Sequence, residues 1–169
     1  MVNEMEKYQI GDYVLYGVSG ACKVTEIGTL SFGGPDKIYY SLKPVYDERS
    51  TIYVPVLKED EISRKVVSRE KAEEIVSTLK GIKPVEVIPE KETWDATLKS
   101  GNQEEVARMI VGLRNLRREN RKNHKGLNIA EERLLRDAER VFFSEMATAF
   151  EMSMEEVVQN LSISLDREE

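Results

Sequence analysis

The segment Tyr13-Val14-Leu15-Tyr16 opens a series of β-rich runs that continues at residues 21–27, 37–45 and 51–56. Tyr, Val, Ile and Thr dominate these runs, as is typical of the pleated, half-buried surface of a strand. Glycine-rich turns separate them, including the Gly-Gly-Pro-Asp sequence at 33–36. Such closely spaced strands predict a small, strongly bent sheet or barrel, because a flat sheet of this size exposes too much edge.

The pattern becomes helical near residue 58, where apolar residues begin to recur at spacings of three and four. Potential N-caps precede these stretches at Ser68, Asn102, Asn128 and Ser153. The last three are each followed three residues later by a glutamate, which is the capping-box pattern. Helices are therefore predicted after these caps.

Two shorter features complete the fold prediction. Prolines flank residues 83–89, which favours extended backbone, and a short helix is expected over residues 90–99. The chain is thus predicted to be α+β. We expect a small bent β-sheet or barrel over residues 1–58, a helix and linker over 59–89, and a compact all-α domain over 90–169.

The composition argues against several classes of protein. The chain has 169 residues, of which 40% are apolar and 33% charged, and this balance suits a globular fold with a substantial core. Cys22 is the only cysteine, so no intramolecular disulfide framework is possible. The N-terminus does not resemble a signal peptide, and no apolar run approaches the roughly 20 residues of a membrane span. We expect a cytoplasmic protein without a membrane partner.

Charge is distributed unevenly along the chain. Overall, 31 acids outnumber 25 bases, and the net charge of −6 argues against a general nucleic-acid binder. Residues 114–125 nevertheless carry six cations against one acid, a net charge of +5. Residues 144–169 carry seven acids against one base, a net charge of −6. The acidity therefore lies largely outside the basic segment.

The basic segment allows two interpretations. A charged stripe on a helix is often only a solvated face, and the following helix offers Glu132–Arg136 and Arg133–Asp137 as ion pairs at i,i+4. The stripe at 114–125 has almost no local acids. Phosphate binding is a reasonable use for it, since arginine forks match phosphate geometry.

The sequence contains no familiar catalytic motif. There is no Walker loop and no GxGxxG, CxxC or HExxH pattern. Cys22 fits a small buried strand residue, and His124, the only histidine, lies in a basic loop. We expect neither catalysis nor a bound metal or cofactor.

Four motifs follow one another in an order that matches a known family. Residues 8–16 read Tyr-Gln-Ile-Gly-Asp-Tyr-Val-Leu-Tyr, and residues 39–42 and 52–56 continue the pattern. Residues 98–102 read Leu-Lys-Ser-Gly-Asn before a long helix, and residues 127–138 read Leu-Asn-x-x-Glu-x-x-Leu-Leu-x-x-Ala. Together they resemble the CarD/CdnL family of bacterial transcription regulators over nearly the whole chain.

This resemblance implies a Tudor-like N-terminal domain, similar to that of the transcription-repair coupling factor, which binds the β subunit of RNA polymerase by strand pairing. It also implies a helical domain that contacts promoter DNA at the upstream edge of the transcription bubble. There the family stabilises the open complex formed with the housekeeping sigma factor. The chain would then be a monomeric, non-enzymatic regulator that reaches DNA only when tethered to polymerase.

The resemblance also assigns residues to two surfaces. The polymerase-facing edge would include Thr29, Leu30, Ser31, Ile52, Tyr53 and Val54. Arginines that the family often places near Leu30 and Tyr53 are absent, which favours strand pairing and apolar contact over ion pairs. The DNA side would involve Arg114, Arg117, Arg118, Arg121, Lys122 and Lys125, with Arg133 and Arg136.

The family's aromatic wedge against DNA is the main departure. Its usual position falls near Val87, which is not aromatic, and the acids Glu90 and Glu92 replace the arginines that follow it. Trp94, the only tryptophan, could serve as the wedge or could pack within the helical domain. These departures leave a second hypothesis open, in which the chain is a polymerase-binding adaptor that makes no direct contact with DNA.

Overall fold

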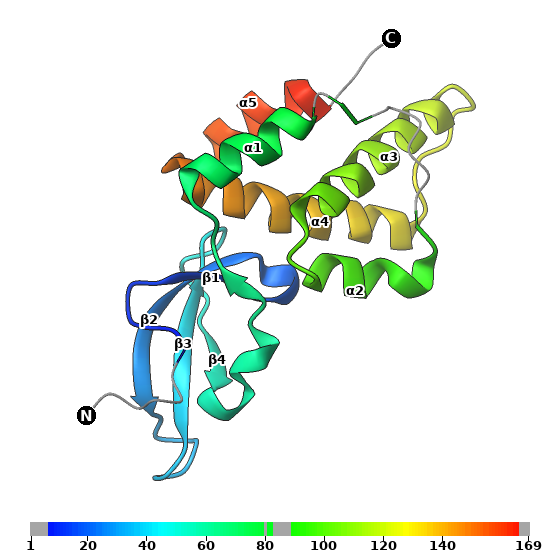
Figure 1. Ribbon diagram of the computed structural model, residues 1–169. Coiled ribbons are helices and arrows are strands. Elements are labelled where there is room, and N and C mark those ends of the chain that lie inside the picture. The colour runs from blue at the N-terminus through cyan, green and yellow to red at the C-terminus, as the bar shows by residue number, and fades with distance from the viewer. Residues whose placement is uncertain (1–6, 80, 83–88, 166–169) are drawn as a thin grey trace.

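The structure, a computed structural model, describes residues 7–79, 81–82 and 89–165, and it consists of a sheet region and a helical region that pack together (Figure 1). Five antiparallel strands form the sheet in the order β4-β3-β2-β1-β5. Their bounds are β1 (Tyr13–Leu15), β2 (Ala21–Thr29), β3 (Ile38–Pro44), β4 (Ile52–Pro55) and β5 (Arg64–Lys65). The short 3-10 helices η1 (Gly17–Ser19) and η2 (Val56–Glu61) lie in its connections.

The predicted strands are confirmed, but the sheet is open and does not close into a barrel. Its two edges are β4 and β5. β5 was not predicted, because two residues are too few to show an alternating pattern. It lies beyond residue 58 and pairs with β1 through Val14 with Lys65 and Leu15 with Arg64.

A small apolar core lies within the sheet region. Val14, Val24, Tyr40 and Leu42 are fully buried there, on β1, β2 and β3. The Tyr40 hydroxyl donates a hydrogen bond to Oε2 of Glu59 at 2.6 Å, which ties η2 to β3. The same hydroxyl oxygen accepts from the backbone N–H of Tyr8 at 3.4 Å, so this buried polar group is hydrogen-bonded on both sides.

Within the described residues, the helical region contains five α-helices. They are α1 (Arg69–Leu79), α2 (Trp94–Lys99), α3 (Gln103–Arg121), α4 (Ile129–Phe150) and α5 (Met154–Leu165), with the 3-10 helix η3 (Lys91–Thr93) ahead of α2. The predicted caps are confirmed at α3 and α4: Asn102 accepts from the N–H of Glu105, and Asn128 and Glu131 form a complete capping box. The expected extended segment at 83–89 lies, except for Pro89, outside the described residues.

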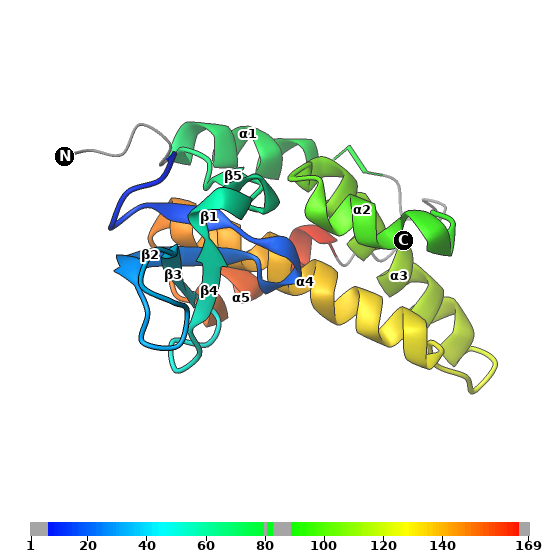
Figure 2. The same ribbon diagram turned by 90° about the horizontal axis from the view of Figure 1, so that it is seen from below.

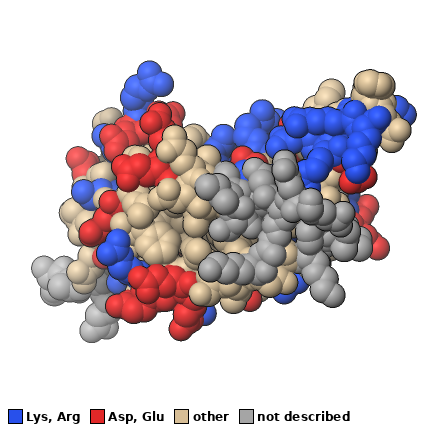
Figure 3. All heavy atoms as spheres, turned by 90° about the horizontal axis from the view of Figure 1, so that it is seen from above, with Lys and Arg blue, Asp and Glu red and all other residues tan. Residues whose placement is uncertain are grey.

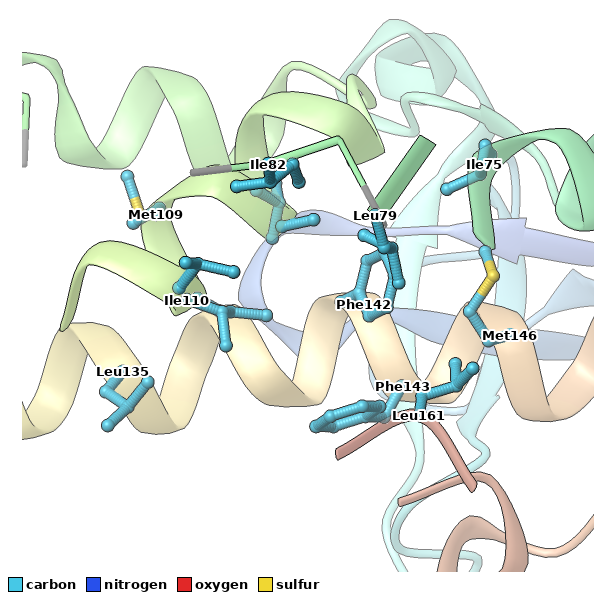
Figure 4. Close-up of a cluster of buried hydrophobic side chains, with 14 of the residues drawn as sticks. Ile75, Leu79, Ile82, Met109, Ile110, Leu135, Phe142, Phe143, Met146 and Leu161 are labelled. Carbon is cyan, nitrogen blue, oxygen red and sulfur yellow. The ribbon is translucent and has the colours of Figure 1, made fainter. Parts of the chain in front are cut away.

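The helices share one core, shown in Figure 4. Leu79 from α1, Ile110 from α3, Phe142 and Met146 from α4, and Leu161 from α5 all contribute buried side chains to it. α1 therefore packs with the helices that follow it, although it lies in the stretch predicted as helix and linker. Burial of large side chains of this kind typically contributes about 1.5–3 kcal/mol each.

One face of α4 rests against the sheet region (Figure 2). The N–H of Ala21 donates to Oγ of Ser144 at 2.9 Å. Gly20, whose φ is +71°, precedes this contact, and a Cβ added there would lie 3.0 Å from the carbonyl oxygen of Arg140 and closer still to Ser144. Only glycine permits this approach of helix and turn.

Candidate functional site

The β4 edge of the sheet is open to a partner. β4 pairs with β3 on one side and with no other described strand. Val54 is buried in the sheet core, whereas Tyr53 is 42% exposed and Ile52 is half-buried. A strand added outside β4 would therefore meet backbone groups along the edge and the ring of Tyr53.

Apolar side chains gather beside this edge. Phe32 and Leu57 are 71% and 79% exposed, and the ring centroids of Phe32 and Tyr53 lie 5.4 Å apart in an edge-to-face contact. We call Phe32, Tyr53 and Leu57 the apolar edge. Sequence reasoning missed Phe32 and Leu57, although a phenylalanine beside the glycine-rich turn at 33–36 was an available signal.

The other predicted polymerase-facing residues lie at the same end of the sheet. Thr29 ends β2 opposite Ile38, and Leu30 and Ser31 begin the loop that carries Phe32. This loop and the start of η2 enclose an open hollow of about 440 Å³, with Leu57 on its wall. The structure thus brings the two predicted segments, 29–31 and 52–54, to one corner of the molecule.

Basic side chains cluster at the opposite end of the molecule (Figure 3). They come from the last turns of α3 and the loop after it, and we call them the basic tip: Arg117, Arg118, Arg121, Lys122 and Lys125. Arg121, Lys122 and Lys125 are exposed, and Arg117 and Arg118 are partly exposed. Lys122 lies 3.0 Å from Glu119, the one acid of the predicted stripe.

Arg114 differs from the rest of the predicted DNA-binding set. Its side chain is only 7% exposed, and Nη2 lies 3.3 Å from Oε1 of Glu139 on α4. Its guanidinium also lies 5.9 Å from the ring centroid of Phe143. Arg114 therefore joins α3 to α4, and we leave it out of the basic tip.

Arg133 and Trp94 line a second open hollow, of about 490 Å³. Trp94 is partly buried against the helical core, and its indole N–H donates to the carbonyl of Pro89 at 2.7 Å. Arg136 is exposed on α4. The available pair Arg133–Asp137 is not formed among the described residues, and Asp137 instead lies 3.7 Å from Arg140.

No group of side chains within the described ranges is arranged to hold a metal ion. Cys22 is fully buried, and burial raises the pKa of its thiol to about 12, so it is not poised as a nucleophile. None of the helices formed by the described residues has the length and apolar character needed to cross a membrane.

Two family models match the chain. Residues 8–66 match the CarD-like/TRCF RID domain, and residues 92–162 match the CarD C-terminal domain. The chain belongs to the CarD family. No curated protein matches it. CarD-family domains are regulatory binding modules, and the family acts in transcription through RNA polymerase.

The two surfaces of this CarD-type protein lie in different matched domains. The apolar edge belongs to the domain at 8–66, and the basic tip belongs to the domain at 92–162. One surface offers backbone hydrogen bonds and aromatic area, and the other offers cations. Such different chemistry suits two different partners.

Proposed function

We propose that this CarD-type protein is a non-enzymatic, cytoplasmic transcription regulator with two contacts. The β4 strand and the apolar edge bind the β subunit of RNA polymerase. From that position the basic tip meets promoter DNA at the upstream edge of the bubble and stabilises the open complex of the sigma holoenzyme. The observation that carries the proposal is that one domain has an open sheet edge and the other has a cationic tip.

The edge suits strand addition rather than ion pairing. Val54 faces the core, so its side chain is not available to a partner, while Tyr53 and Phe32 present aromatic surface. Backbone hydrogen bonds supply affinity in this mode of recognition, and side chains beside the strand supply specificity. Aromatic residues are also the side chains that most often dominate interface energies.

The tip suits phosphate rather than base recognition. Its side chains are cations gathered at one helix end and the loop after it, and such groups neutralise phosphates without reading sequence. A contact of this kind is weak by itself. It becomes effective when the other domain holds it near DNA, because tethering raises its local concentration to about the millimolar range.

The test reverses charge at the tip and compares it with an equal change elsewhere. Arg121→Glu with Lys125→Glu alters two exposed tip residues, and Lys43→Glu with Lys71→Glu makes the same charge change on β3 and α1. We expect the tip variant to lose the gain in open-complex lifetime while binding core polymerase normally. The control variant should keep both properties.

The adaptor without DNA contact is the second candidate function, favoured by the position of Trp94. The indole of Trp94 is bonded to Pro89 and packs on the core, which does not suit a wedge inserted into DNA. If the tip variant prolongs the open complex as well as the wild type does, the adaptor replaces the regulator that contacts DNA.

A further inference from the structure

We propose that Glu145 and Arg64 lock the sheet region and the helical region into one rigid body, so that binding at the apolar edge fixes where the basic tip lies. This inference rests on the function proposed above. It names the residues that hold the basic tip at a fixed position relative to the apolar edge. Neither residue belongs to either surface, so both act as positioning residues.

Glu145 forms the centre of the contact. It lies on α4 and is fully buried. Its Oε1 accepts hydrogen bonds from Nη2 of Arg64 at 2.8 Å and from Nε2 of Gln103 at 2.7 Å, and its Oε2 accepts from the backbone N–H of Val67 at 2.9 Å. A carboxylate that has lost its hydration is stable only with such partners. We call Arg64, Val67, Gln103 and Glu145 the lock.

Arg64 and the neighbouring Ser63 also bond to the end of α2 and to the turn after it. The same Nη2 donates to the carbonyl of Gly101 at 2.7 Å, in the turn between α2 and α3. The neighbouring Ser63 donates from Oγ to the carbonyl of Lys99 at 2.9 Å. A planar guanidinium can serve a carboxylate and a carbonyl together, which the single ammonium of lysine does less well. Edge strand β5 and Ser63 before it are thereby joined to α4, to the end of α2 and to the turn between α2 and α3.

Further contacts lie on the same face of α4. Ser144 accepts from the N–H of Ala21, and the guanidinium of Arg140 lies 4.2 Å from the ring centroid of Tyr46. Arg140, Ser144 and Glu145 lie within about one and a half turns of a single helix, and each contacts a different segment of the sheet region. The Glu145 carboxylate has all its partners of the lock in the observed orientation of the two regions, and rotating one region against the other would remove its bonds with Arg64. Oε1 of Gln103 is buried without a hydrogen-bond partner among the described residues, so the bonds of the lock centre on the carboxylate.

The lock lies between the two surfaces that the proposed function uses. β4 and β5 are opposite edges of the sheet. The basic tip lies where α3 gives way to α4, whereas Glu145 lies near the other end of α4 (Figure 1). A flexible joint at the lock would spread the tip over a larger volume and reduce its effective concentration at DNA.

The first experiment measures the distance between the two regions. Spin labels are placed at Lys43→Cys on β3 and Glu132→Cys on α4, both exposed, while buried Cys22 remains unlabelled. We expect one narrow distance distribution for the unaltered lock. Arg64→Ala should broaden it, and Arg64→Lys, which keeps the charge but not the fork, should broaden it less. Lys65→Ala, the adjacent exposed residue of β5, should leave it narrow.

The second experiment tests whether the effect on open-complex lifetime depends on the basic tip being held in a fixed position by the lock. Folded Arg64→Ala protein should bind core polymerase within about twofold of the wild type and yet lose the gain in open-complex lifetime, with partial recovery in Arg64→Lys. If Arg64→Ala does not fold, the width of the distance distribution and the open-complex lifetime are compared between Arg64→Lys and Lys65→Ala. A distribution that stays narrow in the Arg64 variants, or one that broadens without any loss of lifetime, overturns the proposal. If the wild type itself has no effect on lifetime, the proposed function fails, while the distance measurement still decides the lock.

Discussion

Arg114 and Arg121 lie two helical turns apart on α3, yet they have different surroundings. Arg114 is 7% exposed and lies against Glu139 and Phe143, whereas Arg121 is exposed at the basic tip. A buried arginine is held by its partner and by packing along its apolar stem. The same residue type therefore stabilises the fold at one position and remains available to a partner at the other.

Replacing these two arginines should separate stability from binding. Arg114→Ala should lower the free energy of unfolding by roughly 2–3 kcal/mol, because it leaves Glu139 without its partner and removes packing on Phe143. Arg121→Ala should change it by less than about 0.5 kcal/mol. Urea denaturation of the two variants checks this, and equal midpoints would refute the structural role of Arg114.

Cys22 should make stability depend on pH in the alkaline range. Burial raises the pKa of its thiol from 9.0 to about 12, so the folded state favours the neutral form. The stability that this contributes is fully present below pH 9 and is lost as the pH rises toward 12. Urea midpoints measured between pH 8 and 11 should therefore fall more steeply for the wild type than for Cys22→Ala. Parallel curves would contradict the assignment.

Among the elements, the loop before β3 and the start of η2 carry the most exposed side chains of the apolar edge. Phe32 and Leu57 are largely exposed, so Phe32→Ser with Leu57→Ser should leave the fold intact while weakening polymerase binding by about tenfold. Ile129→Ser, at a position 90% exposed on α4, is the matched control and should bind normally. Binding to immobilised core polymerase measures both. Unchanged binding of the double variant would remove the apolar edge from the interface.

Sequence patterns predicted those elements whose ends carry their own signals. The α4 capping box could be predicted from the sequence because Asn128 and Glu131 are three residues apart and bond each other. β5 could not be predicted, because its two residues form a strand only by pairing with β1. The contact of Phe32 with Tyr53 and the bond between Arg64 and Glu145, 81 residues apart, depend on tertiary packing that no local pattern encodes.

At the scale of the whole molecule, charge is separated in space as well as in sequence. The exposed acids Glu70, Glu73 and Glu74 lie on α1, whereas the basic tip lies at the far end of α3 (Figure 1). One predicted member of the acidic C-terminal segment, Glu145, is instead buried and paired with Arg64. Among the described residues, cations therefore gather at the end formed by α3 and the loop after it, on a chain whose net charge is −6.

This polarity predicts weak binding to free DNA and a clear contact within the polymerase complex. At physiological salt, fluorescence polarisation with duplex DNA should give a dissociation constant no tighter than about 10⁻⁴ M, the weak end of non-specific binding. Footprinting of the polymerase–promoter complex should nevertheless show added protection at the upstream edge of the bubble. Tight, saturable binding to free duplex would contradict delivery by polymerase.

The length of β4 sets how long an encounter lasts. This strand has four residues, and its last, Pro55, has no N–H to donate, so a partner strand can form only a few hydrogen bonds along it. At roughly 1 kcal/mol net for each bond, such a ladder does not hold a partner for long. We therefore expect rapid exchange of the protein among polymerase molecules, so that its occupancy follows its cellular concentration from one round of initiation to the next.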